Sequence, residues 1–439
     1  MKLSTKAVLL LAFFVTLTST GYANKLFGDT TRAYAVPTLI KTPKGQVAVS
    51  WTEKDNAGVV YFYWAESADK GRTFGDKKLI FSSPGLGSSR LMRPKLLFKK
   101  DGTVVAVFSL RGPETAVAQT NQPNAHASHE AASSGHDHGT AASHSDNKPR
   151  TDSPSKGGPR AGGRPTDLQI VYCYSGDNGN TWSVPTPVHS DKSPNIVRGF
   201  FDATILANGE IGVAYLNDIA GKAHQRDLRF VTSTGNRFGT EKILDPFVCD
   251  CCNISLLVDA GGTLQVYYRE NQDNIRDIAT MSSGDNGLTF TKPAILSKDN
   301  WQINGCPHSG PTSSASATGT VIAWFSGTTD APGIRLVNQQ GKRLFVLDDP
   351  SARNAYLVPA PKTSVLLWEQ SQPSETGTAS VIAFRTVGSD QTSATQFVKN
   401  GLNATNASGI VMGNQLVVAY EVRTTNNKNS VSFAQVDLP

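Results

Sequence analysis

Four cysteines stand in two short segments that are far apart in the sequence. Three form a Cys-x-Cys-Cys run at Cys249, Cys251 and Cys252, and the fourth is Cys306, with His308 two residues later. Thiolates at this density suit soft metals such as copper(I), or zinc. The alternative is a disulfide from Cys306 to Cys251 or Cys252, since exported proteins usually oxidise paired cysteines. Because four cysteines are available, a disulfide and a metal site can coexist.

A second source of metal ligands is a stretch over residues 112–166. It holds five of the eight histidines of the chain, and its His136 and His138, one residue apart, could chelate a transition metal. Ala, Ser, Gly and Pro dominate the stretch, so it cannot bury enough apolar surface to order itself. We therefore expect a disordered insertion, which acts either as a metal collector or as a solvated linker. The fifth cysteine, Cys173, lies in an apolar run and is expected to be a buried, inert thiol.

Charged residues around the cysteine segments form a set of candidate binding residues. They are Arg198, Arg269, Glu270, Arg276, Asp277 and Arg353. Arginine suits a carboxylate ligand because the guanidinium group donates two parallel hydrogen bonds. For each of these residues, the alternative interpretation is a solvated side chain on a loop.

The elements that must position these residues are strand-like and repetitive. An apolar strand, a glycine-containing turn and two further strands recur in seven units, which start near residues 36, 94, 201, 253, 310, 355 and 408. This spacing is typical of β-propellers. The last unit lacks a fourth strand, which the segment 24–28 could supply to close the ring. The sequence thus predicts an all-β chain, with one propeller of four-stranded blades over residues 24–439. Seven blades are favoured, and six are the alternative.

The octapeptide Ser-x-Asp-x-Gly-x-Thr-aromatic occurs three times, at residues 67–74, 175–182 and 283–290. A degenerate copy covers residues 233–238. The aspartate can accept hydrogen bonds from its own turn, the glycine supplies a positive φ, and the aromatic ring packs between strands. The repeats therefore predict hairpin turns of one kind.

This octapeptide is similar to the Asp box of bacterial neuraminidase repeats, so the chain resembles the sialidase superfamily. The resemblance implies that each box joins the third and fourth strands of a blade, on the face opposite the active site. Sialidases have six blades, so seven would be a departure. The Cys-x-Cys-Cys and Gly-Cys-Pro segments resemble those of a divergent subgroup of this superfamily.

The resemblance also implies a set of catalytic groups. Sialidases use three arginines for the substrate carboxylate, a tyrosine nucleophile assisted by a glutamate, and an aspartate acid. Their first arginine lies in a Phe-Arg-Ile-Pro motif, and in the corresponding stretch of this chain, residues 34–37, Ala35 occupies its position. This departure counts against sialidase activity.

Three function classes follow from these observations. The sequence favours a binding role on the cysteine-bearing face, and the most specific hypothesis is that this face handles copper or zinc. A glycoside hydrolase that acts on glycans is one alternative, and a propeller that binds a glycan or a protein without metal is the other. The ligand and the oligomeric state are left open.

The N-terminus has the pattern of a secretory signal. Lys2 and Lys6 precede an apolar run over residues 7–17, which is too short for a convincing membrane span, and residue 23 ends a small-residue cleavage site. We therefore expect a signal peptide over residues 1–23 and a periplasmic or extracellular protein that is not integral to a membrane. Without Lys2 and Lys6 the net charge falls from +6 to +4, and no basic run is interleaved with aromatics, so nucleic acid is not an expected partner.

Overall fold

The computed structural model describes residues 26–112, 167–219, 225–375, 377–399, 401–424 and 426–438. These residues belong to one compact unit, from which residues 113–166 are separate. The expected signal peptide and nearly all of the expected insertion, including His136 and His138, lie outside the described residues, so export stays a prediction. The described residues contain no helix with the length and hydropathy of a membrane span.

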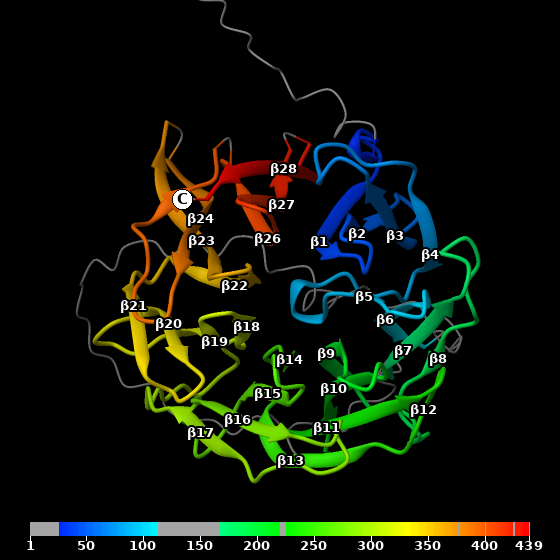
Figure 1. The fold of residues 1–439 in the computed structure, drawn as a ribbon, viewed down its shortest axis with the longest axis horizontal. Helices are drawn as coiled ribbons and strands as arrows, with labels where there is room; N and C mark the ends of the chain where they lie inside the picture. The colour runs from blue at the N-terminus through cyan, green and yellow to red at the C-terminus, as the bar shows by residue number, and fades with distance from the viewer. Residues whose placement is uncertain are drawn as a thin grey trace, which may run out of the picture. The chain divides into compact units, whose positions relative to one another are not determined.

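The described unit is a β-propeller of seven blades, and each blade is a separate antiparallel sheet (Figure 1). The first two blades consist of β1 (Ala33–Lys41), β2 (Val47–Lys54), β3 (Val60–Ser67), β4 (Lys78–Ser83), β5 (Lys95–Phe98), β6 (Val104–Arg111), β7 (Leu168–Ser175) and β8 (Thr186–Pro187). The third consists of β9 (Arg198–Ile205), β10 (Ile211–Asp218) and β11 (Gln225–Thr234), with β12 (Arg237–Phe238) and β13 (Lys242–Cys249) both paired to β11.

The remaining four blades follow in chain order. They are β14 (Ser255–Val258), β15 (Leu264–Arg269), β16 (Ile278–Ser283) and β17 (Ala294–Ser297); β18 (Thr312–Ser316), β19 (Gly319–Ser326), β20 (Gly333–Asn338) and β21 (Arg343–Asp348); β22 (Arg353–Pro359), β23 (Ser364–Ser374), β24 (Gly377–Val387) and β25 (Gln396–Phe397); and β26 (Ala404–Met412), β27 (Gln415–Arg423) and β28 (Asn429–Asp437). The first strand of each blade lies nearest the centre of the ring (Figure 1). The prediction of an all-β propeller with seven blades is confirmed.

The last blade has three strands, and the described part of segment 24–28, which was expected to supply a fourth strand, does not pair with it. Residues 26–27 form a short helical turn rather than a strand. The Phe27 ring packs edge-on against Tyr34 and Trp51 of the first blade and also lies against Phe433 of the last. The expectation of a fourth strand is therefore wrong for the described part of this segment, because a buried aromatic anchor takes the place of strand pairing.

Side chains, rather than strand pairing, close the ring between the first and last blades. The Val36 N–H donates a hydrogen bond of 2.7 Å to the buried Glu421 carboxylate, and the Leu39 N–H donates one of 3.1 Å to the Ser408 hydroxyl. These bonds satisfy buried polar groups that would otherwise be costly.

Tyr420 is a core residue of the last blade, so the hydroxyl next to Glu421 in sequence is not presented to a ligand.

The three Asp boxes lie between the third and fourth strands of the first, second and fourth blades, as the resemblance implies. In the second box, the Asp177 carboxylate accepts hydrogen bonds from the Thr181 N–H at 2.9 Å and the Thr181 hydroxyl at 2.7 Å. The glycine of this box, Gly179, has φ +77°, and a Cβ there would overlap the Trp64 indole of the preceding blade. The box thus closes a turn and also packs one blade on the next.

The second blade carries the insertion. β6 and β7 pair directly up to Arg111 and Leu168, so the described residues on either side of the insertion lie at one end of a strand pair. Cys173 on β7 is fully buried in the core between the first two blades, and burial raises the pKa of its thiol to about 12. This placement fits an inert thiol.

Candidate metal-binding site

Three loops at the axial ends of neighbouring blades build the site. One runs from β13 into β14 and carries Cys249, Cys251 and Cys252; another joins β15 to β16; the last runs from β17 to β18. The second and third loops pair like strands, since the Arg276 N–H donates to the Trp301 carbonyl at 2.8 Å. The two cysteine segments precede and follow the same blade, β14–β17, and the β15–β16 loop of that blade contacts the second segment.

The side chain of Asn253 joins the two cysteine segments directly. Its Oδ1 accepts a hydrogen bond of 2.9 Å from the Gly310 N–H, and its Nδ2 donates one of 3.1 Å to the Pro311 carbonyl. Only glycine fits at position 310, because a Cβ there would overlap the Asn253 backbone. Arg269, at the end of β15, also holds the loop of the second segment by donating from Nε to the Ser309 carbonyl at 2.8 Å.

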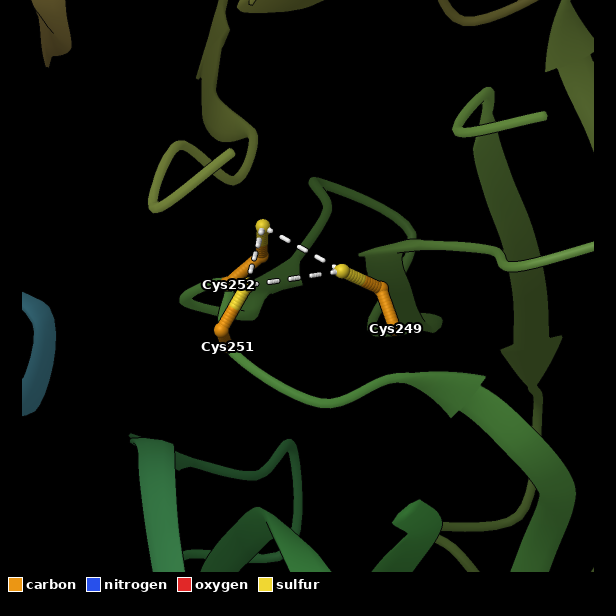
Figure 2. Close-up of side chains that lie close together, drawn as sticks. All are labelled: Cys249, Cys251 and Cys252. Atoms are coloured by element: carbon orange, nitrogen blue, oxygen red, sulfur yellow. Dashed lines mark hydrogen bonds between the residues drawn. The ribbon is translucent and has the colours of Figure 1, made fainter. Parts of the chain in front are cut away.

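The sulfur atoms of Cys249, Cys251 and Cys252 form a triangle (Figure 2). The Sγ–Sγ distances are 3.8 Å between Cys249 and Cys251, 3.5 Å between Cys249 and Cys252, and 4.0 Å between Cys251 and Cys252. A metal bound at the zinc–sulfur distance of about 2.3 Å spaces its sulfur ligands about 3.8 Å apart in a tetrahedron and about 4.0 Å in a trigonal plane. The three residues are 1%, 4% and 3% exposed, so the triangle is shielded from water.

A second group of potential ligands shares one residue with this triangle. The ligand atoms of Cys251, Cys306 and His308 all lie within 4.8 Å of one another. Cys306 is half-buried, with its Sγ 3.6 Å from the Asp250 carboxylate, and His308 is exposed. His308 has φ +48°, a strained conformation for a residue other than glycine. All five ligands predicted in the described chain are therefore gathered in one place.

The triangle of sulfurs has an asymmetric charge pattern. The pKa of the Cys249 thiol lies well below its ordinary value, because the thiols of Cys251 and Cys252 stabilise its thiolate and the nearby Arg276 adds a smaller effect. Hydrogen bonding to Cys249 raises the pKa of Cys251, and burial raises that of Cys252. Cys249 is therefore the thiol of the triangle that ionises most easily.

Arg276 is a positive group that acts on Cys249 of this triangle, as Arg269 and Arg90 act on Cys252. It is 1% exposed, and neither its Nε nor its Nη1 has a hydrogen-bond partner in the described protein. Its Nη2 donates a long hydrogen bond of 3.5 Å to Oδ1 of Asn274. A buried guanidinium that the protein does not satisfy is costly, and it favours an anionic occupant next to it.

Glu270 is a buried carboxyl group that interacts electrostatically with Cys249. Burial, together with the neighbouring Asp245, raises the pKa of Glu270 to about 8, and Cys249 contributes in the same direction. Glu270 therefore holds its proton at neutral pH and adds no negative charge to the site.

The other predicted binding residues are engaged in contacts within the protein. Arg269 is 2% exposed and donates to the carbonyl groups of Ser309, Arg276 and Phe325. Arg198 is 1% exposed and lies 3.1 Å from the Asp191 carboxylate. Asp277 is 4% exposed and accepts from the Asp299 N–H at 3.1 Å. Arg353 is exposed and stacks on the Phe325 ring with 3.9 Å between Cζ and the ring centroid.

An axial cavity of about 130 Å³ borders the cysteine site through Asn253, Ser309 and Gly310. Its other polar lining residues are Arg90, Arg93, Lys95, Asp202, Ser255, Thr312, Asn354, Tyr356 and Asn406. None of these residues was predicted. Arg90 and Arg93 stand shortly before β5, the innermost strand of the second blade. Cys252 and Asn253 stand in the same way before β14 of the fourth blade. This shared position is the sequence signal that could have pointed to the two arginines.

Most charged groups of this cavity are paired within the protein. Arg93 donates from Nη1 to the Pro37 carbonyl at 2.7 Å, so its guanidinium lies against the stretch in which Ala35 replaces the motif arginine. Lys95 pairs with Asp202 at 2.6 Å. Arg90 differs, because its guanidinium makes no hydrogen bond or ion pair with the described residues.

The comparisons with known proteins agree with the fold. The BNR repeat-like domain matches residues 158–321, and no curated protein matches the chain. Among solved structures, an ulvan lyase of polysaccharide lyase family 25 aligns with a TM-score of 0.52 at 12% identity, covering 93% of this chain and 94% of that one. A protein of unknown function from Dyadobacter fermentans aligns at 0.49 and 13%, covering 93% and 96%. The intramolecular trans-sialidase of Ruminococcus gnavus aligns at 0.48 and 14%, also covering 93% and 96%.

The Asp boxes, the seven blades and the matched repeat domain together define the class of this protein. It is a β-propeller of seven blades whose residues 158–321 match the BNR repeat-like domain, and the resemblance predicted from the sequence is confirmed to that extent. At 12% identity, the likeness to the ulvan lyase concerns the fold, and the chemistry has to be argued from the site.

Proposed function

We propose that this propeller binds a soft metal ion, with copper(I) favoured over zinc, through Cys249, Cys251 and Cys252. The observation that carries the proposal is the triangle of buried sulfurs, with edges of 3.5, 3.8 and 4.0 Å. Copper(I) prefers sulfur donors and is satisfied by three of them. Zinc needs a fourth ligand, which a site shielded from water does not readily supply.

The charge around the triangle supports the same occupant. A copper(I) ion with three thiolates carries a net charge of −2, and the neighbouring Arg276 guanidinium is buried with two nitrogens that have no partner in the described protein. The bound cluster would supply the negative charge that this guanidinium lacks, which offsets the cost of burying it. Glu270, which stays protonated, does not oppose the cluster.

A binding role is favoured over glycoside hydrolysis because the cavity offers few groups to a substrate. A sialidase-like enzyme needs several arginines that are free to bind a carboxylate. Here Arg198 and Arg269 are buried and committed to protein partners, and Arg93 donates to backbone carbonyls. Arg90 alone among the described arginines of the cavity faces it without a partner.

That single guanidinium supports a second candidate function, the binding of an acidic sugar in the axial cavity. Tyr356, Asn354 and Asn406 would supply the stacking and hydrogen-bonding surface next to Arg90. Titration with a uronic acid or sialic acid should then show binding that Arg90→Met abolishes. Equal binding by the variant would contradict this candidate.

The test of the main proposal is an anaerobic titration of the reduced protein with copper(I) against a chromophoric chelator. Wild type should compete for the metal, and the double variant Cys251→Ser/Cys252→Ser should not. Cys173→Ala is the matched control, since it removes a buried thiol far from the site, and it should behave as wild type. Circular dichroism verifies that each variant is folded. Equal competition by wild type and the double variant overturns the proposal, and so does a disulfide between Cys249 and Cys252 that resists mild reduction.

A further inference from the structure

We infer that the site holds two metal ions in adjacent subsites that share Cys251 as a bridging thiolate. The inner subsite is the triangle of Cys249, Cys251 and Cys252, and the outer subsite consists of Cys251, Cys306 and His308. The inference rests on the proposed function and adds a second ion and a route by which the first one arrives.

The shared residue follows from the geometry. Cys251 belongs to both groups of ligand atoms, and within each group all of these atoms lie within 4.8 Å of one another. A thiolate sulfur has three lone pairs, so it can bond to two soft ions at once. The outer subsite offers two sulfurs and one imidazole nitrogen, a donor set that copper(I) and zinc both accept.

The two subsites differ in their access to solvent. The inner sulfurs belong to residues that are 1–4% exposed, whereas Cys306 is half-buried and His308 is exposed. An ion from solvent therefore meets Cys306 and His308 first. It then moves inward through Cys251 by exchange of one ligand at a time. Each thiol that binds releases its proton to solvent, and copper stays in the +1 state, so no oxidant or reductant is required.

The backbone holds the outer ligands beside the inner ones. Asn253 binds both Gly310 and Pro311, so the loop that carries Cys306 and His308 is tied to the other cysteine segment at two points, and Arg269 at the end of β15 binds the same loop at Ser309. His308 lies in this tethered loop with φ +48°. Strain of this kind in a well-tethered loop is typical of positions where a side chain has to be aimed.

The charges nearby suit a cluster of two ions. Two copper(I) ions with four thiolates and a neutral imidazole carry a net charge of −2. The Arg276 guanidinium lies near Cys249, and the Arg90 guanidinium interacts with both Cys252 and His308. Together with Arg269, which interacts with Cys252, these cations offset the negative charge of the cluster. The Asp250 carboxylate beside Cys306 adds a local negative charge that attracts the incoming cation.

The test counts copper(I) equivalents in the full-length, reduced protein. Wild type should bind two equivalents, whereas Cys306→Ser and His308→Ala should each bind one tightly. The affinity of these variants for the second equivalent should be lowered at least ~100-fold, because even the loss of a residue that only hydrogen-bonds a metal ligand lowers metal affinity about 10–100-fold. Asn304→Ala, on the same exposed loop, is the control and should bind two. X-ray absorption should detect a copper–copper distance in wild type that His308→Ala lacks.

Loading kinetics test the route. In stopped flow, the single equivalent should load more slowly into His308→Ala than the first equivalent loads into wild type. Binding of only one equivalent by wild type, unchanged in Cys306→Ser and His308→Ala, overturns the two-ion site but leaves the proposed function standing. Absence of any binding that depends on Cys249, Cys251 and Cys252 overturns both. Circular dichroism again verifies folding.

Discussion

The Asn253 side chain and the Gly310 backbone are joined by a hydrogen bond of 2.9 Å, and this bond crosses between the two cysteine segments. The close approach is possible because position 310 has no Cβ. The arrangement of the proposed metal ligands therefore depends on a contact between two residues that are not proposed as ligands themselves.

Gly310→Ala should disrupt that contact. The added Cβ would overlap the Asn253 backbone, so the loop must shift, and we expect a loss of about 1–3 kcal/mol in the free energy of unfolding together with weaker binding of copper(I). The matched control is Gly305→Ala, because a Cβ at position 305 meets nothing within 4 Å. Urea denaturation and copper(I) competition measure the two effects. Equal behaviour of the two variants would contradict the role of the contact.

Replacing Arg276 should change stability and metal affinity in opposite directions. Arg276→Met removes a buried guanidinium that has two nitrogens without partners, so the metal-free protein should gain about 1–3 kcal/mol. Copper(I) affinity should fall, because the cluster loses its neighbouring cation. Arg269→Met is the contrasting variant: its guanidinium donates to three backbone carbonyls, so the metal-free protein should lose stability. Thermal unfolding and competition assays report both quantities, and a stability loss for Arg276→Met would refute the argument.

Sialic acid release should be negligible. Ala35 stands at the position of the motif arginine, and Arg93 from the second blade directs its guanidinium to the Pro37 carbonyl at 2.7 Å instead of leaving it free for a substrate. A fluorogenic sialoside measures the activity, and turnover at about 1 per second or more would show that this expectation is wrong. Ala35→Arg alone should not create activity, because Arg93, Arg198 and Arg269 stay engaged with protein partners and a carboxylate would find only Arg90 besides the new arginine.

The second Asp box should make the fold sensitive to acid. Hydrogen bonds from the Thr181 N–H and hydroxyl lower the pKa of Asp177 from 3.8 to about 2. Because the pKa in the folded protein lies below the ordinary value, the stability from this carboxylate is present above about pH 4 and is lost as the pH falls toward 2. Asp177→Ala should therefore lower Tm at pH 6, and the difference from wild type should vanish near pH 2.

The control for this prediction is Asp390→Ala. Asp390 is exposed and has a single side-chain contact in the structure, a hydrogen bond of 3.0 Å from the neighbouring Ser389 hydroxyl. Its replacement should leave Tm nearly unchanged across the same pH range. A Tm difference for Asp177→Ala that persists at pH 2 would mean that the box acts through packing and not through its charge.

The repeats and the turn chemistry could be predicted from the sequence because they are local. Alternating apolar residues between Gly-containing turns mark strands, and an octapeptide such as residues 175–182 carries every group that its turn needs. The grouping of Cys249 with Cys306 could also be predicted, since loops before the first strands of adjacent blades must meet near the axis of a propeller.

What each side chain does was decided by the tertiary structure. Arg198 and Arg269 look in the sequence like ligands for an anion, but packing buries them against protein partners, while Arg90 reaches the cavity from a different blade. The Phe27 side chain packs between the first and last blades of the propeller, where a fourth strand was expected. The approach of the Cys306 loop to the other cysteines likewise involves the tie between Asn253 and Gly310. Side-chain direction, burial and close backbone approach arise from contacts between residues far apart in the chain, and a local pattern carries no information about them.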